Sequence, residues 1–166
     1  MIVVEPGDRM PGMPLHNLNA TLEFQATTKL MLALGMAAHS GVFLRGNENN
    51  EHQPGDSYRV GDPLHPGPNT PVRVYDNPGK TDGYAVFRVN AEYRVGRRLL
   101  VFGQVNNLFN AQYFSGGRLG VNPFSPSTHG AVGASGWNYN ADEWRYASFV
   151  APGAPRAAWV GLEWRY

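Results

Sequence analysis

Residues 155–166 read P-R-A-A-W-V-G-L-E-W-R-Y, and this stretch decides the fold class. Side chains alternate between the two faces of an extended strand. One face of this stretch carries Ala158, Val160, Leu162, Trp164 and Tyr166. The other carries Ala157, Trp159, Gly161, Glu163 and Arg165. An apolar face opposite a charged one suits a sheet that is covered by a second layer, or a membrane barrel whose apolar face meets lipid.

The composition favours alternating strands that are joined by polar loops. The mean hydropathy is −0.37, although 42% of the 166 residues are hydrophobic. The net charge of +1 gives no basic footprint for nucleic acid. The longest apolar run covers only residues 30–38, whereas a membrane-spanning helix needs roughly 20 residues. The absence of cysteine excludes disulfides and thiolate chemistry.

Period-two alternation predicts about five strands. The predicted strands cover residues 17–25, 29–44, 84–95, 99–109 and 155–166. The second is ambiguous, because its Leu, Met and Ala residues also favour a helix. Gly35 and Gly41 weaken that helix, so we favour a strand.

The connections between these strands are of two kinds. Short turns are predicted at residues 26–28 and 96–98, and long polar loops at 46–82 and 115–150. Outer-membrane barrels have short turns on one side of the membrane and long loops on the other. Several strand positions opposite the apolar residues are charged, which suits a wet lumen better than a dry core. They are Glu23, Arg88, Glu92, Arg94, Glu163 and Arg165.

Three stretches in combination resemble the C-terminal end of TonB-dependent outer-membrane receptors. They are G-Y-A-V-F-R-V-N-A-E-Y-R-V (83–95), L-L-V-F-G-Q-V-N-N-L-F-N-A-Q-Y (99–113) and P-G-A-P-R-A-A-W-V-G-L-E-W-R-Y (152–166). The family's V-x-N-L-F-(D/N)-x-x-Y pattern, which marks its penultimate strand, is present from Val105 to Tyr113. The resemblance covers nearly the whole chain. It implies an all-β fold, namely an antiparallel up-and-down segment of a transmembrane β-barrel with long extracellular loops.

The resemblance also implies where the chain belongs in a cell and what surrounds it. The expected location is the outer membrane of a Gram-negative bacterium, with the short turns in the periplasm. Receptors of this family have a 22-strand barrel, a plug and a segment that engages TonB. We therefore expect residues 1–166 to be the C-terminal part of such a barrel, without the plug and the N-terminal strands. No signal peptide opens the sequence, so an export signal would have to lie upstream.

The implied function is a share in the uptake of an iron–siderophore or a similar nutrient, without transport by this chain alone. The implied partners are outer-membrane lipid, the other barrel strands and the plug. TonB would act through the plug, and the barrel-assembly machinery would recognise the terminal aromatic strand. The alternative is a self-standing small β protein that acts as a soluble binding module or an oligomeric pore.

The last long loop contains the candidate ligand-binding residues. They are Arg118, Trp137, Tyr139, Trp144 and Arg145. Aromatic rings and guanidinium groups suit an aromatic or anionic siderophore, or a carbohydrate. The aromatic residues suit equally well a girdle at the membrane interface or packing within the loop. Tyr113, Trp164 and Tyr166 are assigned to the interface girdles.

No motif indicates an enzyme, a cofactor or a metal site. The histidines lack metal-site spacing, and the loop acids Glu48, Glu51, Asp56 and Asp62 lack the spacing of a calcium loop. Ser125 and Ser127 lie near His129 in the sequence, but no orienting acid accompanies them. We therefore expect a non-enzymatic protein.

Overall fold

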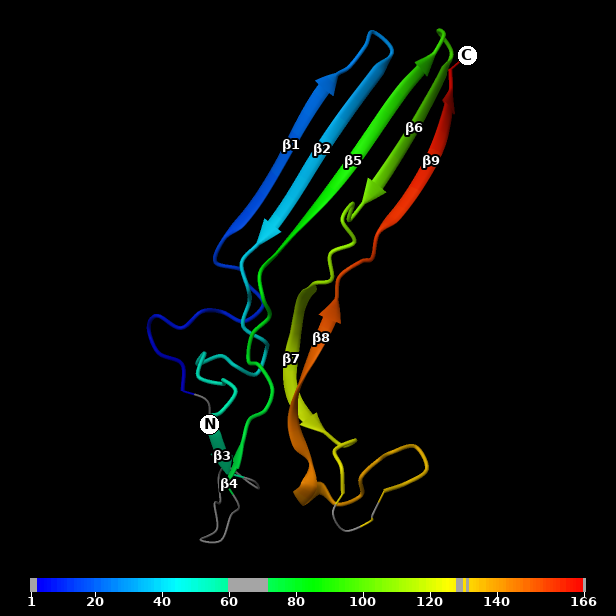
Figure 1. Cartoon of the computed structure of the whole chain (residues 1–166). Coiled ribbons are helices and arrows are strands. Elements are labelled where there is room, and N and C mark those ends of the chain that lie inside the picture. Colours follow the sequence, from blue (N-terminus) through cyan, green and yellow to red (C-terminus); the bar gives the residue numbers. More distant parts are fainter. Residues whose placement is uncertain (1–2, 60–71, 128–129, 131, 166) are drawn as a thin grey trace. The chain divides into compact units, whose positions relative to one another are not determined.

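The computed structural model describes residues 3–59, 72–127, 130 and 132–165 (Figure 1). Contacts between Cα atoms divide the chain into two compact units. The sheet unit comprises residues 14–41, 82–114 and 152–166. The loop unit comprises residues 1–13, 42–81 and 115–151. The interface aromatic Tyr166, the loop acid Asp62 and His129 lie outside the described residues.

The sheet unit is an open antiparallel sheet of five strands in the order β1-β2-β5-β6-β9 (Figure 1). Its strands are β1 (Asn17–Gln25), β2 (Leu30–His39), β5 (Tyr84–Val95), β6 (Leu99–Asn106) and β9 (Ala157–Trp164). The predicted all-β fold and strand count are therefore confirmed. The ambiguous segment is a strand, because β2 pairs along its whole length with β1 on one side and β5 on the other.

The register of these pairings collects the apolar residues of all five strands on one face. Leu22 opposes Leu34, and Leu34 in turn opposes Val89. Val89 opposes Val105, and Val105 opposes Ala158. Every second residue of each strand lies on the same face as these residues. This apolar face bears no charged residue on any of the five strands.

The opposite face of the sheet is polar, and two glycines make room on it for long side chains. The Arg88 side chain lies across Gly35 on β2, where a Cβ atom would come within 2.5 Å of its Nε atom. Arg88 Nη2 donates to Thr21 Oγ1 at 3.4 Å. The Phe102 ring covers Gly161 on the edge strand β9 in the same way. An aromatic ring over an edge glycine compensates for its missing side chain.

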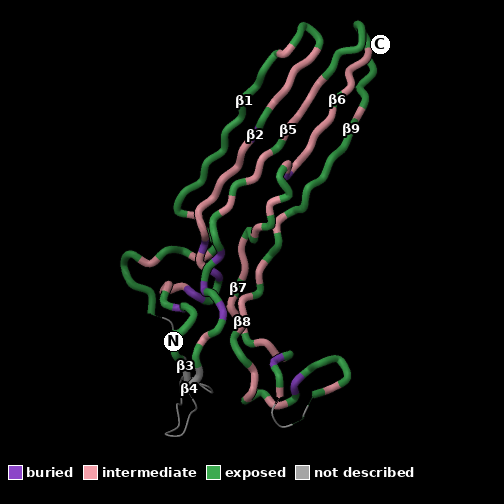
Figure 2. The backbone as a smooth tube through the Cα atoms, in the orientation of Figure 1, coloured by how far each residue is buried: buried purple, intermediate pink, exposed green. Residues whose placement is uncertain are grey.

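The sheet unit buries almost nothing, as Figure 2 shows. Among its described residues only Gly35 and Asn107 are buried. Leu22, Val160 and Leu162 on the apolar face are 68%, 76% and 70% exposed. Exposure of an apolar face of this size to water is unfavourable.

Strand β6 is shorter than predicted, because the Asn-Leu-Phe-Asn motif turns the chain. The strand was expected to reach Phe109, but it ends at Asn106. Asn107 and Asn110 both have positive φ angles, of 48° and 52°. Asparagine tolerates this left-handed conformation better than most residues do. The side chain of Asn107 donates to the carbonyls of Ala111 (2.9 Å) and Ala154 (3.0 Å), and accepts from Ala111 N (2.8 Å).

The loop unit contains more regular structure than predicted. Its elements are β3 (Ser57–Arg59), β4 (Val72–Val74), β7 (Phe114–Asn122), β8 (Arg145–Pro152) and the 3₁₀ turn η1 (Ala141–Glu143). The pairs β3-β4 and β7-β8 each form a two-stranded sheet. The prediction of plain loops was therefore wrong for these stretches, because glycines interrupt the alternation in β7. In the part of the chain that the structure describes, no helix has the length and hydropathy to cross a membrane.

We expect Asn107→Ala to lower the free energy of unfolding by about 2 to 4 kcal/mol, because it removes three hydrogen bonds of a buried amide. Urea titration of the chain in detergent micelles, followed by tryptophan fluorescence, measures this loss. Asn110→Ala is the matched control, because Asn110 shares the positive φ but makes one exposed bond, to Arg156 N at 3.1 Å. Equal losses in the two variants would contradict the assigned role of the Asn107 side chain.

Candidate functional site

The loop unit is built around a short extended segment, residues 42–45. Leu44 N donates to Gly79 O at 2.9 Å, and Arg45 N donates to Gly117 O at 3.1 Å. Arg45 O in turn accepts from Leu119 N at 2.7 Å. The segment is therefore held between the two long polar regions of the sequence. Leu44 is fully buried there.

Two glycines permit this close packing. A Cβ atom on Gly79 would approach the His52 carbonyl oxygen to 2.1 Å. A Cβ atom on Gly117 would lie 2.4 Å from the Phe149 carbonyl oxygen and 3.1 Å from the Leu44 side chain. Any larger residue at either position would force the backbone apart. Gly117, one of the glycines that obscured strand β7 in the sequence, is thus required by its neighbours.

Asn47 fixes the turn that follows this segment. Its side chain is completely buried. Asn47 Nδ2 donates to Gly79 O (3.0 Å) and His52 O (3.3 Å), and its Oδ1 atom accepts from His52 N (2.9 Å). This one amide therefore joins the turn of residues 47–52 to the backbone at Gly79.

His52 is buried beside this amide. Its Nε2 atom lies 3.1 Å from Asn77 O, and its ring centroid lies 3.8 Å from that of Tyr75. Burial lowers the pKa of His52 below its ordinary value of 6.5, against the opposing effects of the Asn77 carbonyl and Asp56. The ring of Tyr146 meets the ring of Tyr75 edge-on, at 5.6 Å between centroids.

An open cleft of about 570 Å³ lies beside His52. Residues of both long polar regions line it. They are Gly46, Asn49, Glu51, His52, Asp56, Ser57, Tyr75, Leu119 and Tyr146. Two tyrosines and two carboxylates suit a polar ligand with apolar surfaces. No group of three or more potential metal ligands gathers anywhere among the described residues.

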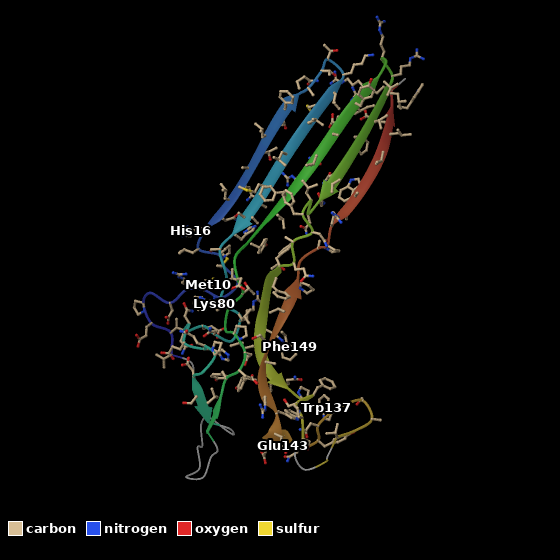
Figure 3. All side chains as sticks on the ribbon, in the orientation of Figure 1. Met10, His16, Lys80, Trp137, Glu143 and Phe149 are labelled. Atoms are coloured by element: carbon tan, nitrogen blue, oxygen red, sulfur yellow. The ribbon has the colours of Figure 1, made fainter. Side chains whose placement is uncertain are left out.

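A second buried asparagine, Asn138, organises the connection between β7 and β8. Its side chain donates to Ser125 O at 3.1 Å and to Glu143 Oε2 at 3.2 Å. Its carbonyl oxygen accepts from Trp144 Nε1 at 2.7 Å. Figure 3 shows Trp137 and Glu143 in this connection and Phe149 on β8.

The structure brings together two of the predicted ligand-binding aromatics. The rings of Trp137 and Trp144 meet edge-to-face at 5.7 Å, and Phe124 extends the row with the same centroid distance to Trp137. Tyr139 is 71% exposed and lies against Gly133. These contacts are consistent with packing within the loop, and a role in ligand binding stays a prediction.

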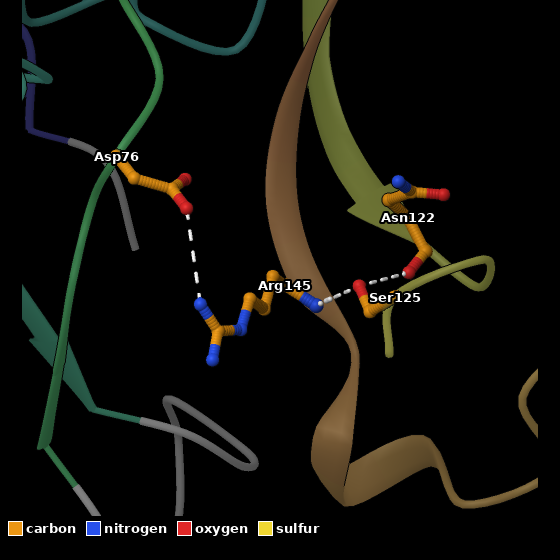
Figure 4. A network of polar contacts seen from close by, with 4 residues as sticks. All are labelled: Asp76, Asn122, Ser125 and Arg145. Carbon is orange, nitrogen blue, oxygen red and sulfur yellow. Dashed lines mark hydrogen bonds and ion pairs between the residues drawn. The ribbon is translucent and has the colours of Figure 1, made fainter. Parts of the chain in front are cut away.

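The two predicted arginines have partners of their own. Arg145 Nη1 lies 3.8 Å from Asp76 Oδ2 (Figure 4), and both side chains are largely exposed. An ion pair with this exposure contributes little stability. Arg145 N also donates to Ser125 Oγ at 2.9 Å, and this serine is thus a structural residue. The guanidinium of Arg118 lies 5.9 Å from the centre of the Phe149 ring.

The described interface aromatics have different surroundings. Trp164 lies on the apolar face, opposite Leu99, and is 58% exposed. The Tyr113 ring lies 4.2 Å from the ring of Tyr84, whose strand position belongs to the polar face, and it covers Gly153. A place at the membrane interface stays a prediction for both residues.

Sequence reasoning missed the buried asparagines that organise the chain beyond the paired strands. They are Asn47, Asn77 and Asn138 in the loop unit and Asn107 in the sheet unit. Asparagines in a polar stretch are normally expected at the surface. Only the Asn-Leu-Phe-Asn motif carried a signal, through the family pattern. The amide of Asn77, which bonds to Ser148 Oγ at 2.8 Å, had none.

The depressed pKa of His52 predicts a stability that depends on pH. The unfolded chain takes up a proton near pH 6.5, whereas folded His52 does so at lower pH. Stability is therefore fully present above pH 6.5 and falls as the pH drops toward the folded-state pKa. The measurement is urea unfolding in a Trp159→Phe, Trp164→Phe background, where both remaining tryptophans lie in the loop unit.

His52→Gln should remove this pH dependence below pH 6.5, whereas His16→Gln in the sheet unit should leave it in place. A slope that persists unchanged in His52→Gln would assign it to another group.

Comparison with known proteins identifies the fold. No family model matches the chain, and no curated protein matches its sequence. The closed form of the ferric-catecholate import receptor Fiu from E. coli K12 matches 92% of this chain with 18% identity and a TM-score of 0.51. Its open form gives a TM-score of 0.49 with 20% identity over 92% of the chain. The ferripyoverdine receptor of the outer membrane of Pseudomonas aeruginosa gives 0.43 with 15% identity over 89% of the chain.

The matched region is a small part of each receptor. This chain covers 14% and 15% of the two Fiu chains and 13% of the ferripyoverdine receptor. The closed-form match agrees with the open antiparallel sheet and with the resemblance found in the sequence. The chain therefore has the fold of a segment of a TonB-dependent receptor barrel.

Proposed function

We propose that this chain forms part of the membrane-spanning wall and two of the loops of an outer-membrane receptor for a ferric siderophore or a similar nutrient. It would belong to the TonB-dependent type and would not transport by itself. The observation that carries the proposal is the uncharged apolar face across all five strands. Its support from known proteins is the fold shared with a ferric-catecholate import receptor.

Lipid is the cover that best suits the apolar face. Contact of this face with water is unfavourable, because the large side chains of Leu22, Val160 and Leu162 are more than half exposed. The strands have 8 to 12 residues, close to the 9 to 11 that a tilted strand needs to cross a bilayer. The polar face would line a wet lumen, where the guanidinium of Arg88 needs no dry-core partner.

The loop unit would supply part of the ligand-binding surface. The aromatic row Phe124-Trp137-Trp144 is built from the second long polar region. Ring faces and nearby guanidinium groups suit an anionic aromatic ligand. On this proposal Arg118, Trp137, Tyr139, Trp144 and Arg145 contact the ligand, and no reaction is catalysed.

An oligomeric pore of identical copies is the weaker alternative. Four successive antiparallel pairings make β1 and β9 run in the same direction. A ring of copies with the same orientation in the membrane would therefore need a parallel seam between β9 of one copy and β1 of the next. Bacterial barrels are antiparallel with an even number of strands.

The receptor proposal requires three partners for this chain. They are the further strands of a receptor barrel, a plug engaged by TonB, and the barrel-assembly machinery acting on β9.

The membrane assignment predicts opposite results for neighbouring residues of β5. Val89→Arg places a charge in the middle of the apolar face and should cost about 2 to 4 kcal/mol of folding free energy in phosphatidylcholine vesicles. Asn90→Arg, on the polar face beside an open space, should cost much less. Protection from trypsin after refolding into vesicles measures both. Equal tolerance of the two substitutions would contradict lipid contact of the apolar face.

The ligand assignment predicts quenching of the loop tryptophans by a soluble ferric tris-catecholate. In the Trp159→Phe, Trp164→Phe background we expect saturable quenching of Trp137 and Trp144. Arg118→Gln with Arg145→Gln should raise the half-saturating concentration about a hundredfold, the effect of two lost charge-assisted contacts. Arg156→Gln, in the sheet unit, is the control and should leave it unchanged. Equal quenching in all variants would leave the arginines without a role in binding.

A further inference from the structure

Cationic side chains gather at the end of the sheet where its short turns lie. This basic row consists of Lys29, Arg94, Arg97, Arg98 and Arg165. Every member is exposed. Lys29 lies in the turn between β1 and β2, and Arg97 and Arg98 lie in the turn between β5 and β6.

Backbone hydrogen bonds place these residues side by side across the sheet. Arg94 N donates to Lys29 O at 2.9 Å, which joins the first turn to the end of β5. Arg165 N donates to Arg98 O at 2.8 Å, which joins the end of β9 to the second turn. Neighbouring strands are about 4.8 Å apart, so the cations follow one another closely along this end of the sheet unit.

Only one member of the row, Arg165, forms an ion pair within the described part of the chain. Glu163 pairs with Arg165 at 2.7 Å, and Glu92 lies near the end of β5. No ion pair joins Lys29, Arg94, Arg97 or Arg98 to a carboxylate among the described residues. Like charges at this spacing repel one another, so an anionic surface that meets the row would relieve the repulsion.

The neighbouring part of the apolar face has the character of a membrane interface. Tyr93 opposes Leu30 and Val101 there, and Trp164 opposes Leu99. The two rings are 45% and 58% exposed. The two aromatic rings thus lie near the end of the apolar face, and Arg97 and Arg98 lie beyond them in the turn, as the polarity of a bilayer changes from acyl chains to headgroups.

The opposite end of the sheet has no such row. The charged residues there are Asp82 and Arg156, one of each sign, and His16. The asymmetry therefore belongs to the short-turn end alone.

We propose that the turn cations of this row, Lys29, Arg97 and Arg98, bind the phosphate groups of anionic phospholipids at the short-turn surface of the membrane. Arg94 and Arg165 face the polar side of the sheet and take no part in this contact. The inference rests on the proposed function, because it requires the apolar face to lie in lipid. Each cation near an anionic membrane contributes about 1 kcal/mol. The row thus holds the short-turn end of the sheet at the level of the headgroups.

The test compares refolding of the full chain into phosphatidylcholine vesicles and into vesicles of phosphatidylcholine mixed with phosphatidylglycerol. We expect tighter association with the anionic vesicles, lost at 1 M salt, where the screening length is about 3 Å. Arg97→Gln with Arg98→Gln should reduce this anionic preference about thirtyfold, the effect of two lost cations. Arg156→Gln, at the other end of β9, is the control and should keep it.

Each outcome decides one of the two proposals. Equal association of the unchanged chain with both kinds of vesicle overturns phospholipid binding by the basic row, but agrees with lipid contact of the apolar face. Association with anionic vesicles alone, sensitive to Arg97→Gln with Arg98→Gln, overturns the lipid contact of the apolar face, and with it the placement of these cations at the headgroups. Displacement by millimolar inorganic phosphate overturns the lipid assignment, because the row would then be a site for free anions. Because each variant is compared with itself on the two vesicles, a general folding defect cancels.

Discussion

The register of the five-stranded sheet is the constraint on which the rest of the structure depends. A slip of one residue would exchange the two faces of a strand. Gly35 opposes both Thr21 and Arg88, so the long arginine side chain finds its space only in this register. A slip of β5 would bring Arg88 onto the apolar face beside Leu34. A charge on the apolar face and the loss of the space over Gly35 would both be unfavourable in the slipped register. Both faces of the sheet therefore favour the observed register.

Outside the paired strands, buried asparagine side chains form the hydrogen bonds that hold the backbone in place. The side chains of Asn47 and Asn107 each donate two hydrogen bonds to backbone carbonyls and accept one from a backbone N–H, so each amide satisfies three backbone groups. Val42 and Leu44 are the buried apolar residues of the described chain, so a hydrophobic core contributes little to the loop unit. Its order depends on satisfied hydrogen bonds in positions where glycines let backbones approach. A unit of this kind tolerates water on its surface and still holds a fixed shape.

The sequence predicts the features of this fold that depend on alternating side chains, and it misses those that depend on backbone angles or on contacts between distant segments. Strand alternation predicted all five sheet strands, and it identified the faces correctly at residues as far apart as Phe24 and Leu162. It failed at β7, where Gly116, Gly117 and Gly120 carry no side chain to alternate. It extended β6 to Phe109, because positive φ angles at Asn107 and Asn110 leave no trace in a hydrophobic pattern. The pairing of Trp137 with Trp144 and the cleft beside His52 depend on contacts between distant segments, which periodicity does not encode.

The free edges of β1 and β9 determine which strand could extend this sheet if its apolar face lies in lipid, as proposed above. Both edge strands present unpaired backbone groups, and in lipid each such group costs several kcal/mol. A strand that pairs with β9 in an antiparallel barrel must run like β6, and its apolar residues must be in phase with Val160 and Leu162. Because β1 runs in the same direction as β9, it does not meet this condition in a copy of the same orientation. The direction and the phase of the partner are thus fixed by the sheet itself, and a strand of the opposite direction, from outside this sheet, is the one that satisfies both.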